Sequence, residues 1–283
     1  MVKLYTILII GFLLVLNGCS QQQSANSLDS TSPNTLTGKL IITGSSTIAP
    51  LAAELALQFE KKNRNSKIDV QTGGSSRGIA DIRQGTSHIG MVSRQLKLAE
   101  NDLKAHLLAK DGVSIIVHKN NPIRELSESQ IRSIYLGKID NWKSLNGVNQ
   151  KITVINKSEG RSTLEVFAKY FKLKNSQIKS NIIIGDNEQA VKLVSKNPHA
   201  IAYVSIGTAE YDIALGIPIK TLPLNGVPAN TATLLKNQFP LSRELNFITK
   251  EQMSALAIAF INYAQSKTAN SIIEGFGFVP THP

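Results

Sequence analysis

The architecture of this chain can be read from one stretch, Thr43-Gly-Ser-Ser-Thr-Ile-Ala-Pro50. A β-branched run precedes it and an apolar pattern of helical period follows it, which is the order strand, turn, helix. Pro50 suits the first turn of a helix, because proline has no N–H to lose there. The hydroxyls and free backbone N–H groups of such a turn meet at a helix N-terminus, where an anion is favoured. The stretch therefore predicts an α/β unit with an anion-binding turn.

The same plan recurs three times further along the chain, each time after a short apolar run. The turns are Gly73–Gly78, Ser93-Arg94 and Gly160-Arg-Ser-Thr163. One such turn is weak evidence, because Ser and Thr cap most helices. Ligands of α/β sheets bind at the carboxyl ends of strands, where all of these turns are expected. Their repetition, with arginines among them, predicts a shared site for an anion.

The remaining sequence continues the alternation of strands and helices that is typical of an α/β fold. Strands are expected at 39–43, 67–72, 88–92, 112–118, 151–156 and 200–204. Helices are expected at 51–63, 79–84, 103–109, 127–135, 163–171, 188–194 and 249–265.

Breaks in composition at Asn121-Pro122 and within Leu222–Asn230 predict two crossings between lobes. We therefore expect one lobe from residues 38–118 and 225–283 and a second from 119–224, each a mainly parallel sheet flanked by helices. Two crossings would make a hinged clamp, which suits capture of a ligand by closure.

The N-terminal residues have the layout of a secretory signal. A positively charged start is followed by an apolar run, Leu4–Leu16, that is too short to cross a bilayer comfortably. Gly18 before Cys19, the only cysteine of the chain, resembles the lipobox of bacterial lipoproteins. We expect a signal peptide at 1–18, acylation of Cys19 as a membrane anchor, and a flexible linker at 19–37. A secreted protein with a free cysteine is the alternative.

The formal net charge of +11 is compatible with nucleic acid, an anionic membrane surface or small anions. The lysines are scattered and no aromatic-interleaved basic patch is visible, so we expect no nucleic-acid partner. The five histidines are scattered too, and neither a Gly-x-Ser-x-Gly elbow nor a metal-ligand spacing is present. We expect no enzyme activity, no metal and no cofactor.

Several segments resemble the bacterial phosphate-binding proteins of ABC importers, within the two-lobed periplasmic-binding class. They run in family order from about residue 39 to 280: Gly44–Pro50, Gly73–Ile79, Ile89–Arg94, Asn121-Pro122, Gly137–Trp142, Ala202–Gly207 and Gly277–Pro280. The resemblance implies a type II periplasmic-binding fold. It also implies a monomer outside the cytoplasmic membrane, facing the periplasm or the cell exterior, that binds inorganic phosphate in its interlobe cleft and delivers it to ABC permease subunits.

The resemblance also implies the ligand contacts. Where the family has an arginine this chain has Lys157, and charge-assisted N–H bonds are the strongest available to a dianion, so we expect Arg161 to replace that guanidinium. Arg94, or less favourably Arg77, is expected to supply a second. The full set of expected ligand residues is Ser46, Thr47, Ser75, Ser93, Arg94, Gly160, Arg161, Ser162 and Thr163.

Ser93 stands where the best-known members have an aspartate. A carboxylate accepts the proton of hydrogen phosphate and repels sulfate, whereas serine only accepts. Sulfate or another tetrahedral oxyanion therefore remains an alternative ligand. A surface adhesin that uses its basic face is a further alternative, and it predicts salt-sensitive binding without a saturable small-ligand site.

Overall fold

The computed structural model describes residues 36–281, and residues 35–283 form one compact unit. The predicted signal peptide, Cys19 and nearly all of the predicted linker lie outside the described residues. Within residues 36–281, the helices are all too short or too polar to cross a membrane.

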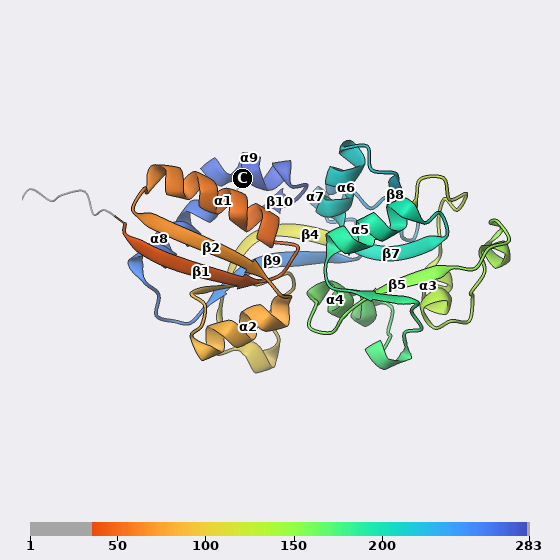
Figure 1. The fold of residues 1–283 in the computed structure, drawn as a ribbon, viewed down its shortest axis with the longest axis horizontal. Coiled ribbons are helices and arrows are strands. Elements are labelled where there is room, and N and C mark those ends of the chain that lie inside the picture. Colours follow the sequence, from red (N-terminus) through yellow and green to blue (C-terminus); the bar gives the residue numbers. More distant parts are fainter. Residues whose placement is uncertain (1–35, 282–283) are drawn as a thin grey trace, which may run out of the picture. The chain divides into compact units, whose positions relative to one another are not determined.

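The elements alternate along the chain as in an α/β fold (Figure 1). The chain begins with β1 (Gly38–Gly44), α1 (Ala49–Lys62), β2 (Ser66–Thr72), α2 (Ser75–Gln84), β3 (Ile89–Val92) and β4 (Lys104–His118). It continues with α3 (Glu128–Tyr135), β5 (Thr153–Lys157), α4 (Ser162–Tyr170), β6 (Ile182–Ile184), α5 (Asn187–Lys196), β7 (Ala200–Ser205), α6 (Ile206–Ala214), β8 (Ile219–Leu222) and α7 (Thr231–Leu235). It ends with β9 (Ser242–Thr249), α8 (Ala255–Ala264), α9 (Asn270–Gly275) and β10 (Val279–Pro280).

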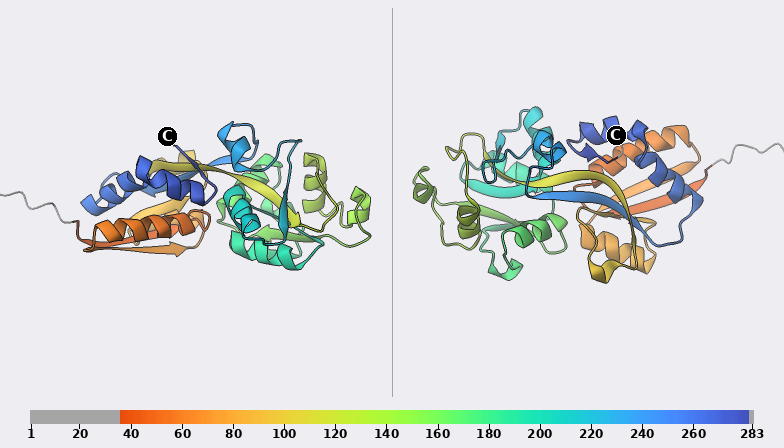
Figure 2. Two further views of the ribbon diagram at one scale, coloured as in Figure 1. Left: turned by 90° about the horizontal axis from the view of Figure 1, so that it is seen from above. Right: turned by 180° about the vertical axis from the view of Figure 1, so that it is seen from behind.

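The strands form one mixed sheet in the order β2-β1-β3-β9-β4-β7-β5-β6. The outer trios, β2-β1-β3 and β7-β5-β6, are parallel as predicted. Between them, β9 and β4 run antiparallel to their neighbours, and β8 and β10 also pair with β4. Figure 2 shows β4 and β9 side by side along the passage from one trio to the other.

Separate apolar cores lie on the two sides of this passage. In one, α1 packs against α8 through Phe59 and Phe260, whose rings meet edge to face with centroids 5.5 Å apart. In the other, Phe167 stacks on Tyr203 at 4.0 Å, and buried Trp142 donates from Nε1 to the carbonyl oxygen of His199. Because the described residues form apolar clusters on both sides of the passage, this continuous sheet carries two lobes.

The predicted helix at 103–109 is wrong, because these residues belong almost entirely to strand β4. Residues Lys104–Gly112 pair with β9. A register shift between Leu107 and Ala109 interrupts the alternation of side chains, so the period of two that marks a strand is lost from the sequence. The predicted helix at 249–265 is shorter than expected, since α8 begins at Ala255 behind the N-cap residue Ser254.

The predicted crossings after His118 and near Asn225 also differ from the structure. Val113–Val117 already pair with β7, while Leu234, Phe239 and Leu241 still belong to the core around Trp142. The chain crosses near Gly112 and again near Ser242, so we call residues 36–112 and 242–281 the first lobe and 113–241 the second. The first crossing lies inside strand β4 and the second at the first residue of β9, so neither falls at the breaks in composition.

Candidate functional site

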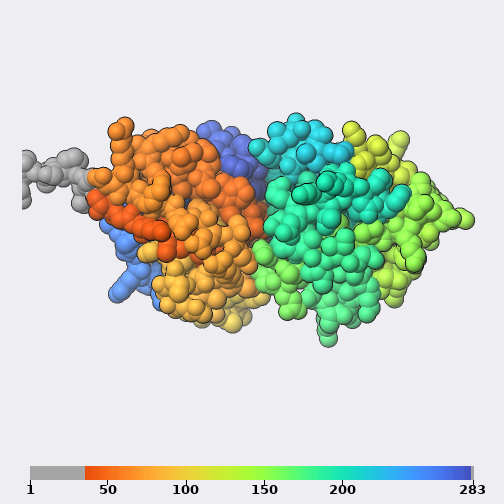
Figure 3. Space-filling view, viewed as in Figure 1, coloured from red at the N-terminus to blue at the C-terminus, as the bar shows by residue number. Residues whose placement is uncertain are grey.

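The four Gly, Ser and Thr turns converge where the lobes meet. Ser45 of the first turn donates from Oγ to Ser93 Oγ over 3.0 Å, and the Ser93 backbone N–H donates to Ser75 Oγ over 3.3 Å. Across the lobes, the Ser76 N–H donates to the carbonyl oxygen of Gly160 over 3.2 Å. Figure 3 shows the two lobes in contact on one face. The predicted convergence of the turns is therefore present in the fold.

An arginine that the sequence analysis missed lies at the centre of these turns. Arg243 donates from Nη1 to Thr163 Oγ1 over 3.0 Å and to Ser93 Oγ over 3.4 Å. Its Nη2 donates to Thr47 Oγ1 over 3.1 Å. The side chain is 1% exposed. One buried guanidinium thus joins hydroxyls from three turns and both lobes.

Arg243 is held in place by Asp111, its register partner on the adjacent strand. Nε and Nη2 of Arg243 donate to Asp111 Oδ2 over 2.9 and 2.7 Å. The carboxylate also accepts from Ser205 Oγ over 2.9 Å and from the Gly207 N–H over 3.3 Å. A buried ion pair is stable only when its remaining polar atoms are satisfied, as here. The pair fixes the guanidinium at the crossing between the lobes.

The hydroxyls around Arg243 retain their own protons for donation. Thr47 Oγ1 accepts from both Arg243 and Asn187 Nδ2, and Ser93 Oγ accepts from both Arg243 and Ser45. Thr163 Oγ1 accepts from Arg243. A hydroxyl has one donor and two acceptor positions, so lone pairs used in this way leave its O–H free to donate. The arrangement is a set of O–H donors suited to an oxyanion.

A second cation, Lys157, lies at the end of β5, three residues before Gly160. It is 2% exposed, and its Nζ donates to the carbonyl oxygen of Asp186 over 2.9 Å. Burial lowers the pKa of Lys157 to about 7, an effect that the positive charges of Arg243 and Arg161 strengthen and that Asp186 opposes. A bound anion would favour the protonated form of this side chain.

The structure does not leave Arg94 available for an anion, contrary to expectation. Its Nη1 and Nη2 donate to the two oxygens of Glu100 over 2.8 Å each, and Nη1 also donates to the Gln95 carbonyl. Its Nε lies 3.0 Å from Glu165 Oε2. Arg77, the weaker candidate, is likewise engaged by Asp81 and by backbone and amide oxygens. Both guanidiniums have local acceptors that the sequence alone does not reveal.

Arg161 lies between backbone segments of both lobes. A Cβ on Gly74 would stand 2.9 Å from Arg161 Cδ, and one on Gly185 would stand 3.1 Å from its Nη2. Gly74 also has a φ of +95°, a conformation that glycine adopts without strain. Glycine at position 74 therefore lets Arg161 pass along the surface of the first lobe.

The other expected residues lie on the same turns. Ser162 is buried at the start of α4, and its Oγ has no hydrogen-bond partner among the described residues. Gly160 has a φ of +80° just before that helix, and Ser46 is half-buried in the first turn. An unpartnered buried hydroxyl is uncommon, and a ligand is one way to satisfy it.

Asn187, the first residue of α5, is a further contact that the sequence analysis missed. From the second lobe its Nδ2 donates to Thr47 Oγ1 in the first lobe, and to Thr208 Oγ1, over 3.2 Å each.

A sequence signal for Arg243 did exist, since it is a lone arginine beside the mostly apolar segment Leu245–Ile248. Nothing local connects it to Asp111, however, because the two are 132 residues apart.

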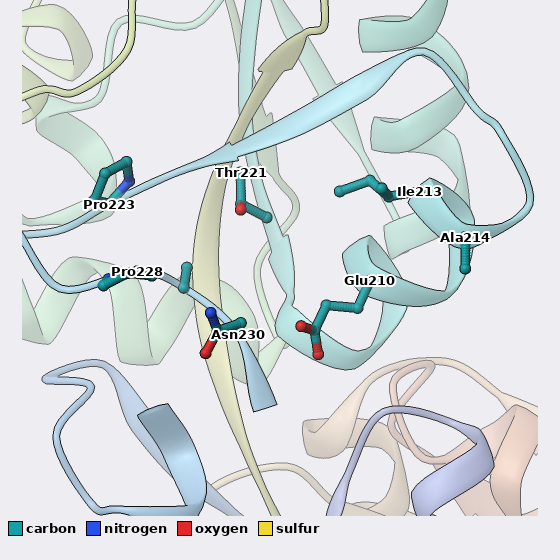
Figure 4. A pocket seen from close by; sticks show the side chains of 8 residues that line it. Glu210, Ile213, Ala214, Thr221, Pro223, Pro228 and Asn230 are labelled. Carbon is teal, nitrogen blue, oxygen red and sulfur yellow. The ribbon is translucent and has the colours of Figure 1, made fainter. Parts of the chain in front are cut away.

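Two cavities among the described residues differ in how well they suit an anion. A cleft of about 790 Å³ opens between α4, the loop after β3 and β9, and it is basic overall, with Arg94, Lys97, Lys110, Lys169 and Arg243 against Glu165 and Glu244. A smaller pocket of about 330 Å³ lies beside α6 in the second lobe (Figure 4). Glu210 is the ionisable side chain that lines it, and its carboxylate already accepts from the Thr231 N–H. The smaller pocket therefore does not suit an anion, whereas the basic cleft does.

The fold and this site define a class, that of two-lobed binding proteins which enclose a small ligand between lobes. Residues 29–268 match the family model described as the PBP superfamily domain. The chain therefore belongs to the PBP superfamily, and within it to the phosphate ABC transporter substrate-binding proteins.

Relatives and solved structures agree with this assignment. The chain is 27% identical over 282 residues to the phosphate-binding protein PstS of Bacillus subtilis, covering 97% of this chain and 92% of that one. It is 28% identical to PstS of Borreliella burgdorferi, covering 84% and 88%. A crystal structure of a Clostridium perfringens protein with bound phosphate has a TM-score of 0.81 at 30% identity and covers 86% of this chain and all of that one.

Proposed function

We propose that the protein binds inorganic phosphate between its two lobes, outside the cytoplasmic membrane, and delivers it to an ABC transporter permease. The observation that carries this proposal is Arg243, a buried guanidinium fixed by Asp111 and surrounded by hydroxyls of both lobes. A dianion in a dry cleft needs converging donors of this kind, because each lost hydrogen bond to water must be replaced.

The placement of each group supports the ligand set that we propose. Thr47, Ser93 and Thr163 donate their free O–H groups, and Arg243 and Lys157 supply positive charge. The N-terminus of α4 contributes the field of its helix dipole, which is favourable to an anion. Further donors on the same turns are Ser46, Ser75, Gly160, Arg161 and Ser162. Arg94 is not in this set, since all three of its guanidinium nitrogens face carboxylates, whereas Nη1 of Arg243 donates to hydroxyls.

Sulfate is a second candidate ligand, and a specific observation favours it. Asp111 already accepts hydrogen bonds from Arg243, Ser205 and Gly207, and Ser93 carries no charge. The proton of hydrogen phosphate therefore meets no free carboxylate among these residues, and no negative charge repels sulfate. We expect weaker discrimination between the two anions than a carboxylate-bearing site would give.

Calorimetric titration of the purified protein with phosphate and with sulfate tests the proposal. The substitution Thr163→Val removes one O–H while nearly preserving shape, and we expect it to weaken phosphate binding at least about tenfold. Thr153→Val, at a partly buried position at the other end of β5, is the matched control. Saturable binding of neither anion would refute the proposal, and equal affinity in both variants would exclude Thr163 as a ligand.

We also propose that acylation of Cys19 holds the protein, as a monomer, at the membrane. The support is the apolar run before the only cysteine and the polar residues after it. Growth of the producing cells with a palmitate analogue should label the protein, and Cys19→Ala should abolish the label and release the protein from the membrane fraction. Unchanged labelling of the Cys19→Ala variant would refute the anchor.

The family is one of substrate-binding proteins, and we assign no reaction to the site between the lobes.

A further inference from the structure

A group of charged side chains joins the two lobes outside the proposed anion site. Glu165 lies in the first turn of α4, in the second lobe. Its Oε2 is 3.0 Å from Arg94 Nε and 2.5 Å from Lys97 Nζ, and both of these cations lie in the loop after β3 of the first lobe. The anion site, as proposed above, does not use Glu165.

The first-lobe half of this group is already rigid. Glu100 accepts from both terminal nitrogens of Arg94 over 2.8 Å each and from the Lys97 backbone N–H over 2.8 Å. All of these contacts lie within the first lobe, so they do not depend on closure. Arg94 therefore presents its Nε to the second lobe in a fixed position, and Glu165 is the partner that closure brings to it.

The interaction is also partly desolvated. The side chain of Arg94 is 8% exposed and that of Glu165 is 24% exposed. Ion pairs on the open surface contribute little, because water and salt screen them. An ion pair shielded to this degree contributes more than an exposed one. The two terminal nitrogens of Arg94 are satisfied by Glu100.

Arg94 and Glu165 are close in sequence to residues of the proposed anion site, so the lobe movement that assembles the site also moves them. Arg94 directly follows Ser93, and Glu165 comes two residues after Thr163. Ser93 and Thr163 come from opposite lobes, and both accept hydrogen bonds from Arg243. The movement that brings these two hydroxyls around one anion therefore also brings Glu165 to Arg94.

We propose that Glu165 is a positioning residue that sets the affinity for the anion by latching the lobes closed, without touching the anion. The inference rests on the proposed function. A ligand that binds only the closed form has an apparent Kd that rises as the population of that form falls. Loss of a contact that exists only between the closed lobes lowers this population.

The variant Glu165→Gln tests the latch, because it removes the charge and keeps the size of the side chain. We expect the Kd for phosphate to rise about tenfold, mainly through faster dissociation. Electrostatic attraction alone predicts the opposite, since removing a negative charge beside the cleft should tighten binding of an anion. Weaker binding is therefore specific to loss of the latch.

Asp102→Asn is the matched control. Asp102 Oδ1 lies 2.6 Å from Arg83 Nη2, and this ion pair lies within the first lobe. We expect the control to bind phosphate as the parent does. Lys97→Gln should weaken binding less than Glu165→Gln, and the double variant should equal Glu165→Gln alone, because Lys97 acts through Glu165. An affinity and dissociation rate of Glu165→Gln equal to those of the parent overturn the inference.

Small-angle X-ray scattering separates this inference from the proposed function. If the parent protein binds no phosphate, the proposed function fails, and the radius of gyration of the ligand-free proteins then decides the latch. A Glu165→Gln variant more expanded than the parent supports it. Equal radii under that condition overturn it.

Discussion

Replacement of Lys157 by methionine removes a cation that the fold buries almost completely. Burial lowers the pKa of Lys157 to about 7, against 10.5 for the unperturbed side chain. Between these pH values the unfolded chain carries a proton on Lys157 that the folded protein has lost. The unfolded state therefore binds more protons, and the stability contributed by this group rises with pH across the window.

The magnitude follows from the same pKa values. One unit of pKa difference corresponds to about 1.4 kcal/mol. The buried lysine therefore costs the ligand-free protein about 5 kcal/mol of unfolding free energy at pH 6, and about 2 kcal/mol at pH 9. Methionine has a similar shape and no charge to desolvate. We expect Lys157→Met to be more stable than the parent, by an amount that shrinks between pH 6 and pH 9.

Urea denaturation of phosphate-free protein at several pH values measures this difference. Lys192→Met, at an exposed position on α5, is the control, and its stability should follow the pH course of the parent. A stability gain of Lys157→Met that does not change with pH would refute the reasoning.

The same variants test the proposed anion site, since a nearby anion favours the protonated form of Lys157. The ratio of parent to Lys157→Met phosphate affinity should fall as pH rises from 6 to 9, and the titration of phosphate itself cancels in that ratio. An affinity ratio that does not change with pH would show that Lys157 lies too far from the anion to respond to it.

Three other substitutions probe the closed site and the core. Arg243→Gln leaves Asp111 buried without its cation, so we expect a loss of about 3–5 kcal/mol in urea denaturation and no measurable phosphate binding by calorimetry; parental affinity would show that Arg243 is not the anchor. Gly74→Ala places a Cβ 2.7 Å from the Gly160 carbonyl oxygen, so scattering should show a more open protein with weaker phosphate binding, and an unchanged radius in saturating phosphate would contradict this. Phe260→Ala should lower the unfolding free energy by about 3–5 kcal/mol while leaving phosphate affinity near the parental value at a temperature where the protein is folded, and a large loss of affinity would mean that this core positions the site.

Much of the fold and of the site could be predicted from local signals. The period of Leu51, Leu55 and Phe59 gave the buried face of α1, and Ser127 marked the start of α3. The four turns were recognised because a strand, a Gly or Ser turn and a helix leave their signature within a few residues. Such signals depend on short-range backbone and side-chain preferences, which the sequence contains in full.

The predictions that differ from the structure concern features that depend on residues far apart in the sequence. The sequence predicts a helix over part of strand β4, because the pairing of β4 with β9 joins residues more than a hundred positions apart and a register shift hides the alternation of its side chains. Arg94 was expected at the anion, yet Glu100 and Glu165 occupy it. Whether an arginine is free for a ligand depends on which carboxylates surround it, and one of these comes from the other lobe.

The sequence by itself therefore determined the α/β alternation, the position of the four Gly, Ser and Thr turns and the family they resemble. Only the tertiary structure decided which cation stands among those turns. Arg243 reaches them because β9 pairs with β4 in the register that sets it opposite Asp111. That register comes from the packing of both lobes on one continuous sheet. It is a long-range property, and no local pattern encodes it.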